Sequence, residues 1–311
     1  MAKAREAIRM PRLSVIVPVR NGGHYVKRAV QSTLLALPAD ASVHVMDDCS
    51  TDDTVEQLEQ INDRRLVVLL KKHKEPGLSA VLNELLDRTD SEYVARMDAD
   101  DIALPWRFRQ QSSYIETRGL DFTFAPVIRF SRRKVAPQRF IGLDPASFNR
   151  ALLLTNPVAH STMYAKRQPL TALGGYRQVQ SEDYDLWLRA AVLGYHLGRS
   201  SMPCLLYRVH AGQVTSKPDW SEASVDEDLL RQSHQALSAK LIGCQVSSLV
   251  GLRAPSIASA DLIAETKRLI AAVRDVSAAS HSQSTKQLRR IANRAEDVLP
   301  TTPPSYGRSR W

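Results

Sequence analysis

The chain has 311 residues, 43% of them hydrophobic, and its 42 Lys and Arg residues exceed its 33 Asp and Glu residues, for a net charge of +9. The length suits one large domain or one domain plus a smaller one, and the charge indicates either anionic partners or only a basic soluble surface. Three widely spaced cysteines argue against a disulfide framework or a zinc site, and no run approaches the roughly 18 apolar residues of a membrane-spanning helix.

Residues 1–12 are basic but lack the apolar core of a signal peptide, so we expect a short lead-in that is disordered or helical. The cysteine count fits a reducing cytoplasm. The expected location is therefore cytoplasmic, or peripheral at the inner face of the membrane.

In chain order, short apolar runs then alternate with segments of helical spacing. The predicted elements are a strand at 13–19, a helix at 24–37, a strand at 43–47, a helix at 53–60, a strand at 65–70, a helix at 77–88 and a strand at 92–97. This alternation predicts βαβ units in a Rossmann-like, mostly parallel α/β sheet flanked by helices. Ligands bind such sheets beyond the carboxyl ends of the strands. The polar stretches RNGG, DDCSTDD and DADD follow three strands, so we expect them to line one crevice.

The second half of the chain is less regular. We expect strands at 121–130, 160–165 and 203–210, a helix at 181–195 with Ser181 as its N-cap, and amphipathic helices at 225–243 and 260–276. The expected organisation is a lead-in at 1–12, an α/β domain at 13–220, a helical region at 221–298 and an irregular, Pro-rich tail at 299–311.

Asp98, Asp100 and Asp101 crowd negative charge directly after the strand at 92–97. A divalent cation such as Mg²⁺ or Mn²⁺ would explain them, since it takes oxygen ligands and bridges carboxylates to phosphate. Residues i and i+2 of an extended segment face the same side, which brings Asp98 and Asp100 together. On the triplet alone, a solvated turn or the cap of a helix starting near Pro105 is the better interpretation.

The wider context reverses that preference. The segments SVIVPVRNGG, DDCSTDDT, GLSAVLNE, ARMDADDIALP, GGYR and EDYDLWLRA occur in an order and spacing that resemble a family 2 glycosyltransferase with the GT-A fold, over roughly residues 13–215. The resemblance implies a nucleotide-sugar donor, usually UDP-linked, a Mn²⁺ or Mg²⁺ ion, and inversion at the anomeric carbon in one displacement. Asp100 would hold the metal, with Asp98 helping through the ribose or a water, and the ion would stabilise charge on the departing nucleoside diphosphate.

On the donor side, the resemblance implies that Asp48 accepts a hydrogen bond from the imide N–H of the base. Asp47 would hold the ribose or its own loop, although one of the two acids could only cap the next helix. The other implied donor contacts are Pro18, Val19, Arg20, Asn83 and Arg96.

Two positions depart from the family pattern. Leu82 stands where an arginine is usual, so a cation near the base or diphosphate is missing, and Arg20 or Arg96 would have to replace it. Cys49 stands where glycine is usual, which argues against a left-handed backbone at that position.

Inverting transfer needs a base that takes the proton of the acceptor hydroxyl. By resemblance Asp183 is that base, and Glu182 is the weaker candidate, which would instead orient the acceptor or a backbone group. The N-terminus of a helix favours a charged carboxylate and so keeps Asp183 available. The simpler interpretation is that both acids only complement the helix dipole. Structural roles are expected for Asp185, Leu186, Trp187 and Leu188, with Leu186 and Trp187 packing the helix onto the sheet.

Four further residues match family positions or suit sugar binding. His210 would be a third metal ligand or a diphosphate contact, although a lone histidine is more often structural. His160 would lie on the acceptor side or order a loop, and Gly175, with Gly174, would form a tight turn near the acceptor. Trp106 would stack on a sugar, or pack in the core.

Competing functions are a nucleotidyltransferase, a non-catalytic sugar-nucleotide or glycan-binding protein, and a nucleic-acid binder. The sequence lacks the Gly-rich basic loop that a nucleotidyltransferase would need. A non-catalytic binding protein would not need the intact Asp98, Asp100 and Asp183, and the acidic crevice argues against nucleic-acid binding. The expected partners are a nucleotide-sugar donor and a glycan or lipid-linked acceptor. Residues 283–311 hold six basic and two acidic residues and are a candidate for contact with anionic lipid, polymer or protein.

Overall fold

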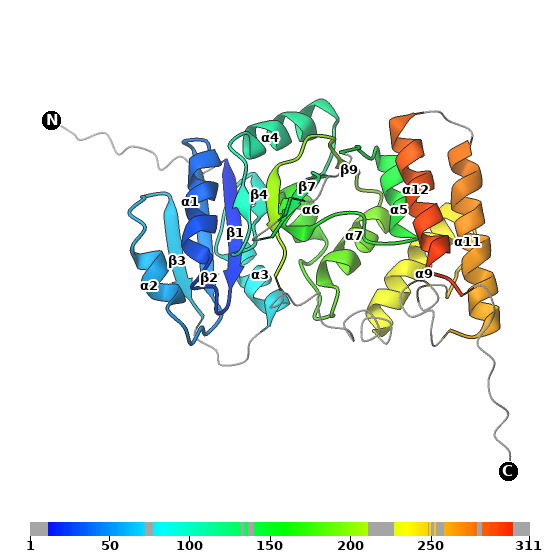
Figure 1. Ribbon diagram of the computed structural model, residues 1–311, viewed down its shortest axis with the longest axis horizontal. Coiled ribbons are helices and arrows are strands. Elements are labelled where there is room, and N and C mark those ends of the chain that lie inside the picture. Colours follow the sequence, from blue (N-terminus) through cyan, green and yellow to red (C-terminus); the bar gives the residue numbers. More distant parts are fainter. Residues whose placement is uncertain are drawn as a thin grey trace, which may run out of the picture.

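The computed structural model describes residues 12–71, 77–131, 134–135, 140–210, 227–247, 249, 252, 258–278 and 282–300. The expected lead-in and tail lie almost wholly outside these residues. Figure 1 shows a sheet flanked by helices in the N-terminal part and a group of helices at the C-terminal side. No helix in the described ranges is both long enough and apolar enough to span a membrane.

The first part of the chain follows the predicted alternation to within two residues at each boundary. Its elements are β1 (Leu13–Val19), α1 (Val26–Ala36), β2 (Ala41–Asp47), α2 (Thr54–Glu59), β3 (Leu66–Leu70), α3 (Leu78–Asp87) and β4 (Tyr93–Arg96). β1 pairs in parallel with β2 and β4, and β2 pairs in parallel with β3. β1 is almost entirely buried, as expected for a parallel strand with both faces covered.

Among the described residues, the main sheet has seven strands in the order β3-β2-β1-β4-β8-β6-β9. β8 (Tyr164–Lys166) runs antiparallel to β4 and to β6 (Phe122–Phe124), while β9 (Leu197–Arg199) runs parallel to β6. β3 forms one edge, where Val67 and Leu70 are 38% and 58% exposed. The predicted mostly parallel α/β sheet is confirmed.

A second sheet corrects two predictions. It contains β5 (Ile102–Ala103), β10 (Leu205–Arg208) and β7 (Val127–Phe130). The single strand expected at 121–130 is wrong, because Pro126 has no N–H for the ladder and the chain passes there from one sheet to the other. The strand expected at 160–165 starts late, since a 3-10 turn at His160–Thr162 (η1) precedes β8.

The remaining helices are α4 (Arg107–Thr117), α5 (Pro145–Leu152), α6 (Arg167–Ala172), α7 (Glu182–Val192), α9 (Asp228–Ile242), α11 (Ala260–Ala278) and α12 (Gln283–Asp297). α7 packs on the sheet as expected, with Leu186 and Trp187 fully buried and the Trp187 ring 4.7 Å from that of Phe124. α9 packs against α7, and α12 packs against α11 and α5. α12 is a third C-terminal helix beyond the two that were predicted.

Candidate active site

The three polar loops meet at one edge of the sheet, as predicted, because β1, β2 and β4 are parallel and end on the same side. Hydrogen bonds join the loop after β1 to the loop after β2. Ser50 Oγ accepts from Asn21 N at 2.8 Å, and Thr54 Oγ1 accepts from Gly22 N at 2.8 Å. The third loop, after β4, carries the three aspartates.

Asp98, Asp100 and Asp101 form a cluster in which ligand oxygens lie within 4.8 Å of one another. Asp101 is buried, and its Oδ1 accepts from Arg208 N at 2.8 Å, so it ties the loop to β10. Burial, followed by the charges of its two neighbours, raises the pKa of Asp101. The side chains of Asp98 and Asp100 remain 26% and 27% exposed, which leaves these two carboxylates available to a ligand.

The residues of this cluster fit a hard divalent cation. Nε2 of His210 lies 2.9 Å from Asp100 Oδ2, so an imidazole nitrogen lies beside the carboxylate oxygens. Oxygen ligands with one imidazole suit Mn²⁺ or Mg²⁺ better than they suit a thiophilic metal. The structure therefore brings together Asp98, Asp100 and His210, and their role as metal ligands stays a prediction.

Two buried arginines lie next to the aspartate loop. Arg96 pairs with Asp98, and Arg107 donates from Nη2 to the carbonyls of Arg96 and Ser161 at 2.6 Å each. Arg96 was predicted at the donor, whereas Arg107 was not predicted there. One sequence feature points to Arg107. It lies in the first turn of a helix, where the helix dipole disfavours a cation, which indicates that another interaction stabilises it there.

The predicted base-binding acid is engaged by a cation that the sequence analysis also missed. Asp48 Oδ1 lies 2.9 Å from Lys71 Nζ, and Asp48 Oδ2 accepts from Gly77 N at 3.1 Å. The two side chains are only 9% and 5% exposed. Lys71 follows β3 directly, at the carboxyl edge of the sheet. It supplies a positive charge next to Asp48, whereas Leu82 stands where the family usually has an arginine.

The other donor-side predictions have mixed placements. Asp47 holds its own loop, since its Oδ2 accepts from Ser50 N at 3.0 Å. Asn83 exchanges two hydrogen bonds of 2.8 Å with the backbone of Tyr176, and Leu82 is fully buried in the core. Their donor contacts stay predictions, as do those of three residues at the end of β1, namely buried Val19, half-buried Pro18 and exposed Arg20.

The inference drawn from Cys49 is wrong. Its φ of 58° lies in the left-handed region although it is not glycine. The neighbouring residues fix the turn, because Asp48 N donates to Val19 O and Ser50 N donates to Asp47. A strained residue of this kind costs on the order of 1 kcal/mol and persists where its surroundings determine the backbone.

Glu182 and Asp183 open α7 near Arg96, whose charge interacts with both. Asp183 Oδ2 accepts from Asn156 Nδ2 at 2.7 Å, and Glu182 Oε1 lies 3.4 Å from His160 Nδ1. Burial raises the pKa of Glu182 to about 7 and also raises the pKa of Asp183, which Glu182 raises further. A helix N-terminus alone would lower the pKa of Asp183, but here desolvation outweighs the dipole and raises it. Ser181 occupies the N-cap position without a capping side-chain bond.

The three predicted acceptor-side residues each contact a different neighbour in the fold. His160 is buried, its Nε2 lies 2.9 Å from the Tyr176 hydroxyl, and burial lowers its pKa to about 3. Gly175 has a φ of +69°, and a Cβ there would collide with Asn83 Oδ1. Trp106 is half-buried and donates from Nε1 to Pro203 O at 2.8 Å. Acceptor contacts by His160, Gly175 and Trp106 stay predictions.

Comparisons with known proteins agree on one family. Residues 14–167 match the family model described as Glycosyl transferase family 2. The chain is 31% identical over 169 residues to the amylovoran biosynthesis glycosyltransferase AmsE of Erwinia amylovora, covering 53% of this chain and 63% of AmsE, which is less than two thirds of that relative. It is 25% identical over 225 residues to the UDP-Glc:alpha-D-GlcNAc-diphosphoundecaprenol beta-1,3-glucosyltransferase WfaP of Escherichia coli, covering 72% and 85% of the two chains.

Two solved structures show the same fold at low identity. S. aureus TarS 1–349, in complex with UDP-GlcNAc, aligns with a TM-score of 0.62 and 17% identity over 94% of this chain and 93% of TarS. The mannosyltransferase PcManGT from Pyrobaculum calidifontis, in complex with GDP-Man and Mn²⁺, aligns with a TM-score of 0.54 and 18% identity over 93% and 81% of the two chains.

Proposed function

The chain belongs to glycosyltransferase family 2 and has the GT-A fold, and we propose that it moves a sugar from a UDP-sugar to a hydroxyl group of a cell-envelope glycan or lipid-linked acceptor, with inversion at the anomeric carbon. One observation carries the proposal. The buried Arg96 pairs with Asp98 of the aspartate cluster and interacts with both acids at the start of α7, which supports a donor site and a base close to each other.

The donor proposal rests on the Asp48–Lys71 pair as well as on the relatives. WfaP is named for UDP-Glc, TarS was solved with UDP-GlcNAc, and PcManGT was solved with GDP-Man. Asp48 accepts hydrogen bonds and Lys71 donates them, so the pair suits a base edge on which an N–H lies beside a carbonyl. Uracil and guanine present such an edge, whereas cytosine and adenine do not.

Asp98, Asp100 and His210 would hold Mn²⁺ or Mg²⁺, an ion that neutralises charge on a nucleoside diphosphate when bound. Asp183 would take the proton of the acceptor hydroxyl. Its raised pKa makes it a stronger base than an exposed aspartate, and Asn156 fixes its orientation. Glu182, beside His160, would orient the acceptor rather than remove its proton.

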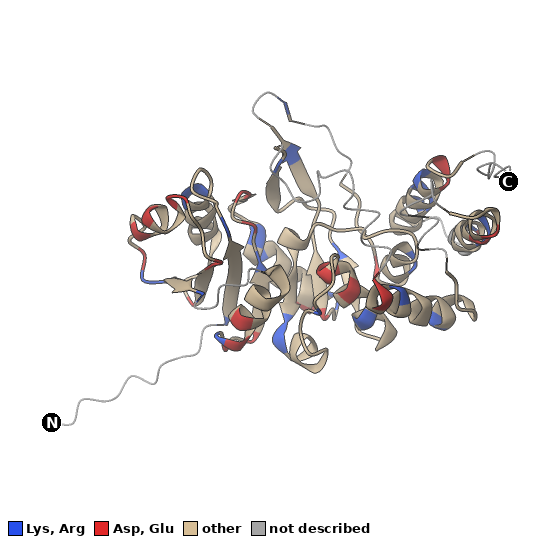
Figure 2. Ribbon diagram, turned by 90° about the horizontal axis from the view of Figure 1, so that it is seen from below, with Lys and Arg blue, Asp and Glu red and all other residues tan. Residues whose placement is uncertain are grey.

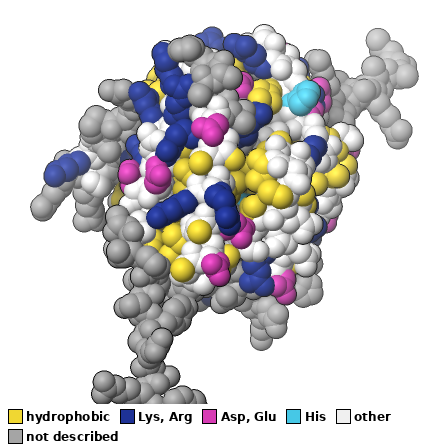
Figure 3. Space-filling view, turned by 90° about the vertical axis from the view of Figure 1, so that its right-hand side faces the viewer, with side chains coloured by type: hydrophobic (Ala, Val, Ile, Leu, Met, Phe, Trp, Pro, Cys, Tyr) yellow, Lys and Arg dark blue, Asp and Glu magenta, His cyan; other side chains and the backbone are white. Residues whose placement is uncertain are grey.

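The acceptor and location are proposed from the relatives' names and from the surface. AmsE and WfaP are named for amylovoran and a diphosphoundecaprenol-linked sugar, so we infer an exported polysaccharide or its lipid-linked precursor, reached from the cytoplasmic side. Figure 2 shows Lys and Arg spread over the whole described chain rather than gathered on one face, which does not favour nucleic acid. Figure 3 shows Lys and Arg around exposed hydrophobic side chains on the face formed by the C-terminal helices, where contact with an anionic membrane is proposed.

A donor-hydrolysis screen tests the function. The protein is incubated with UDP-, GDP- and dTDP-sugars, with and without Mn²⁺, beside Asp100→Ala and Asp183→Asn. Metal-dependent release of one nucleoside diphosphate that is lost in both variants would support the proposal. If no sugar nucleotide is hydrolysed and calorimetry detects no nucleotide binding, the chain is not a glycosyltransferase in function and the non-catalytic alternative replaces it.

A further inference from the structure

The first helix of the C-terminal region, α9, contacts the residues on both sides of the Glu182–Asp183 pair. Before the pair, Glu227 Oε1 accepts from Gln180 N at 3.2 Å. After the pair, the Ser233 hydroxyl lies 2.8 Å from Asp185 Oδ1. Since α9 starts more than forty residues after α7 begins, no local sequence pattern announces these contacts.

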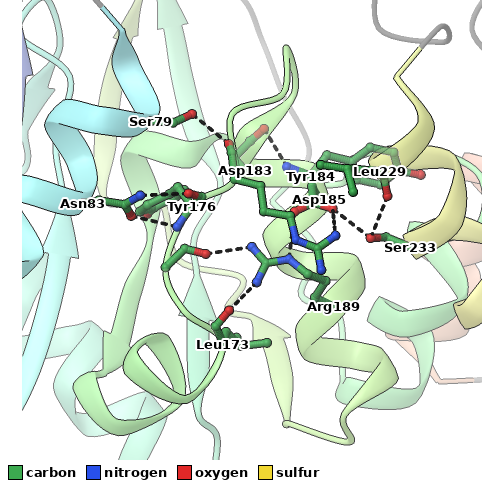
Figure 4. A network of polar contacts seen from close by, with 12 residues as sticks. Ser79, Asn83, Leu173, Tyr176, Asp183, Tyr184, Asp185, Arg189, Leu229 and Ser233 are labelled. Atoms are coloured by element: carbon green, nitrogen blue, oxygen red, sulfur yellow. Dashed lines mark hydrogen bonds and ion pairs between the residues drawn. The ribbon is translucent and has the colours of Figure 1, made fainter.

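Asp185 is the residue through which α9 holds α7. Its carboxylate is fully buried and pairs with Arg189 Nε at 2.8 Å and with Arg177 Nη1 at 3.6 Å. The Ser233 hydroxyl also lies 3.0 Å from Leu229 O (Figure 4). A carboxylate is the stronger acceptor, so the hydroxyl donates its single hydrogen bond to Asp185. Removing a partner from a buried carboxylate destabilises the folded state. The hydrogen bond between Ser233 and Asp185 therefore helps to fix the position of α9 relative to α7.

Arg189 extends the same network towards the donor half of the crevice. It donates from Nη1 to Leu173 O and from Nη2 to Gly175 O, each at 2.7 Å. The turn at residues 173–176, to which Arg189 donates, is also hydrogen-bonded to Asn83 of α3 through Tyr176 (Figure 4). A continuous set of polar contacts therefore runs from α9 through α7 to the helix that follows β3.

α9 is itself held rigidly in place. His234 is buried and its Nε2 lies 3.0 Å from Leu153 O, just after α5. Lys240 donates to Val192 O at 2.7 Å, at the far end of α7. The helix is thus anchored to the core independently of Ser233, so removing one hydroxyl changes the grip on α7 without releasing α9.

We propose that α9 is a positioning element for the acid pair and that Ser233 is a positioning residue for the transfer reaction. This inference rests on the proposed function, because it gives the acid pair its task. A base must be held within a fraction of an ångström of the reacting hydroxyl, and small displacements cost large factors in rate. The C-terminal region therefore acts on the chemistry and not only on acceptor choice.

Ser233→Ala tests the proposal against Ser238→Ala. Ser238 lies on the same helix and is also buried, but within the described part of the chain its hydroxyl bonds to Gln235 O and Val246 N and to no residue of α7. We expect Ser233→Ala to lower kcat for donor hydrolysis by about tenfold with an unchanged donor KM, whereas Ser238→Ala stays within about twofold. Ser233→Thr, which keeps the hydroxyl, should recover most of the rate.

Hydrogen exchange gives a readout that needs no substrate. Amides of residues 180–186 should exchange faster in Ser233→Ala than in Ser238→Ala, while those of α9 should match. Equal exchange in the two alanine variants, or an equal loss of kcat, would overturn the proposal. Faster exchange in a protein that hydrolyses no sugar nucleotide would support the grip of α9 on the acid pair while refuting the proposed function, so the two failures are distinguishable.

Discussion

Replacing the buried Glu182 by glutamine should make the folded protein more stable at neutral and alkaline pH. Burial raises the pKa of Glu182 from 4.5 to about 7. The folded state therefore holds a proton that the unfolded chain releases, and stability falls as pH rises from about 4.5 to about 7. At 1.36 kcal/mol per pH unit the loss is about 3 kcal/mol above pH 7. Glutamine keeps the shape of the side chain without the charge and should avoid this loss.

The assay is urea unfolding of wild type and Glu182→Gln at pH 5 and pH 8. The variant should gain about 3 kcal/mol relative to wild type at pH 8 and little at pH 5. Glu56→Gln is the matched control, because Glu56 also lies in the first turn of a helix but is exposed. A Glu182→Gln protein that is less stable than wild type at pH 8, or a gain that is equal at both pH values, would refute the reasoning.

Three further outcomes are expected. Lys71→Met should weaken UDP binding about tenfold in calorimetry, because it removes a buried hydrogen-bond donor beside Asp48, the proposed base-binding acid, and unchanged affinity would exclude Lys71 from base recognition. Gly175→Ala should lower the free energy of unfolding by about 3 kcal/mol in urea, against about 1 kcal/mol for Gly119→Ala, which has positive φ but an open surrounding; equal losses would contradict the steric argument. Asn156→Ala removes a hydrogen bond that favours charged Asp183, so the acidic limb of the pH profile for donor hydrolysis should move to higher pH, and a shift to lower pH would reject Asp183 as the base.

Local patterns were enough to predict the order of elements and the edge of the sheet that carries the site. Apolar runs such as LSVIVPV and VHVMD identify parallel strands because both of their faces are buried, and the polar loops after them must then meet. The break between β6 and β7 also has a local signal, because Pro126 cannot donate to a strand ladder.

The chemistry of the site depended on contacts between distant segments, which no local pattern contains. Lys71 reaches Asp48 from the next strand, and Arg107 lies under the aspartate loop from a later helix. Side chains such as His160 approach the acid pair of α7 from other elements. The helix N-terminus at Asp183 suggested a lowered pKa, whereas burial in the fold raises it. Cys49 shows the same limit for the backbone, since its surroundings impose a conformation that its residue type disfavours.

The edge strand β3 has a consequence for self-association. Among the described residues, no strand pairs with its outer side, and Val67 and Leu70 expose apolar side chains there. An edge of this kind presents backbone donors and acceptors to any extended chain, so two copies could join their sheets through it at high concentration. Val67→Lys would place a charge on that edge, far in sequence from the acids of α7, and offers a route to preparations that resist aggregation.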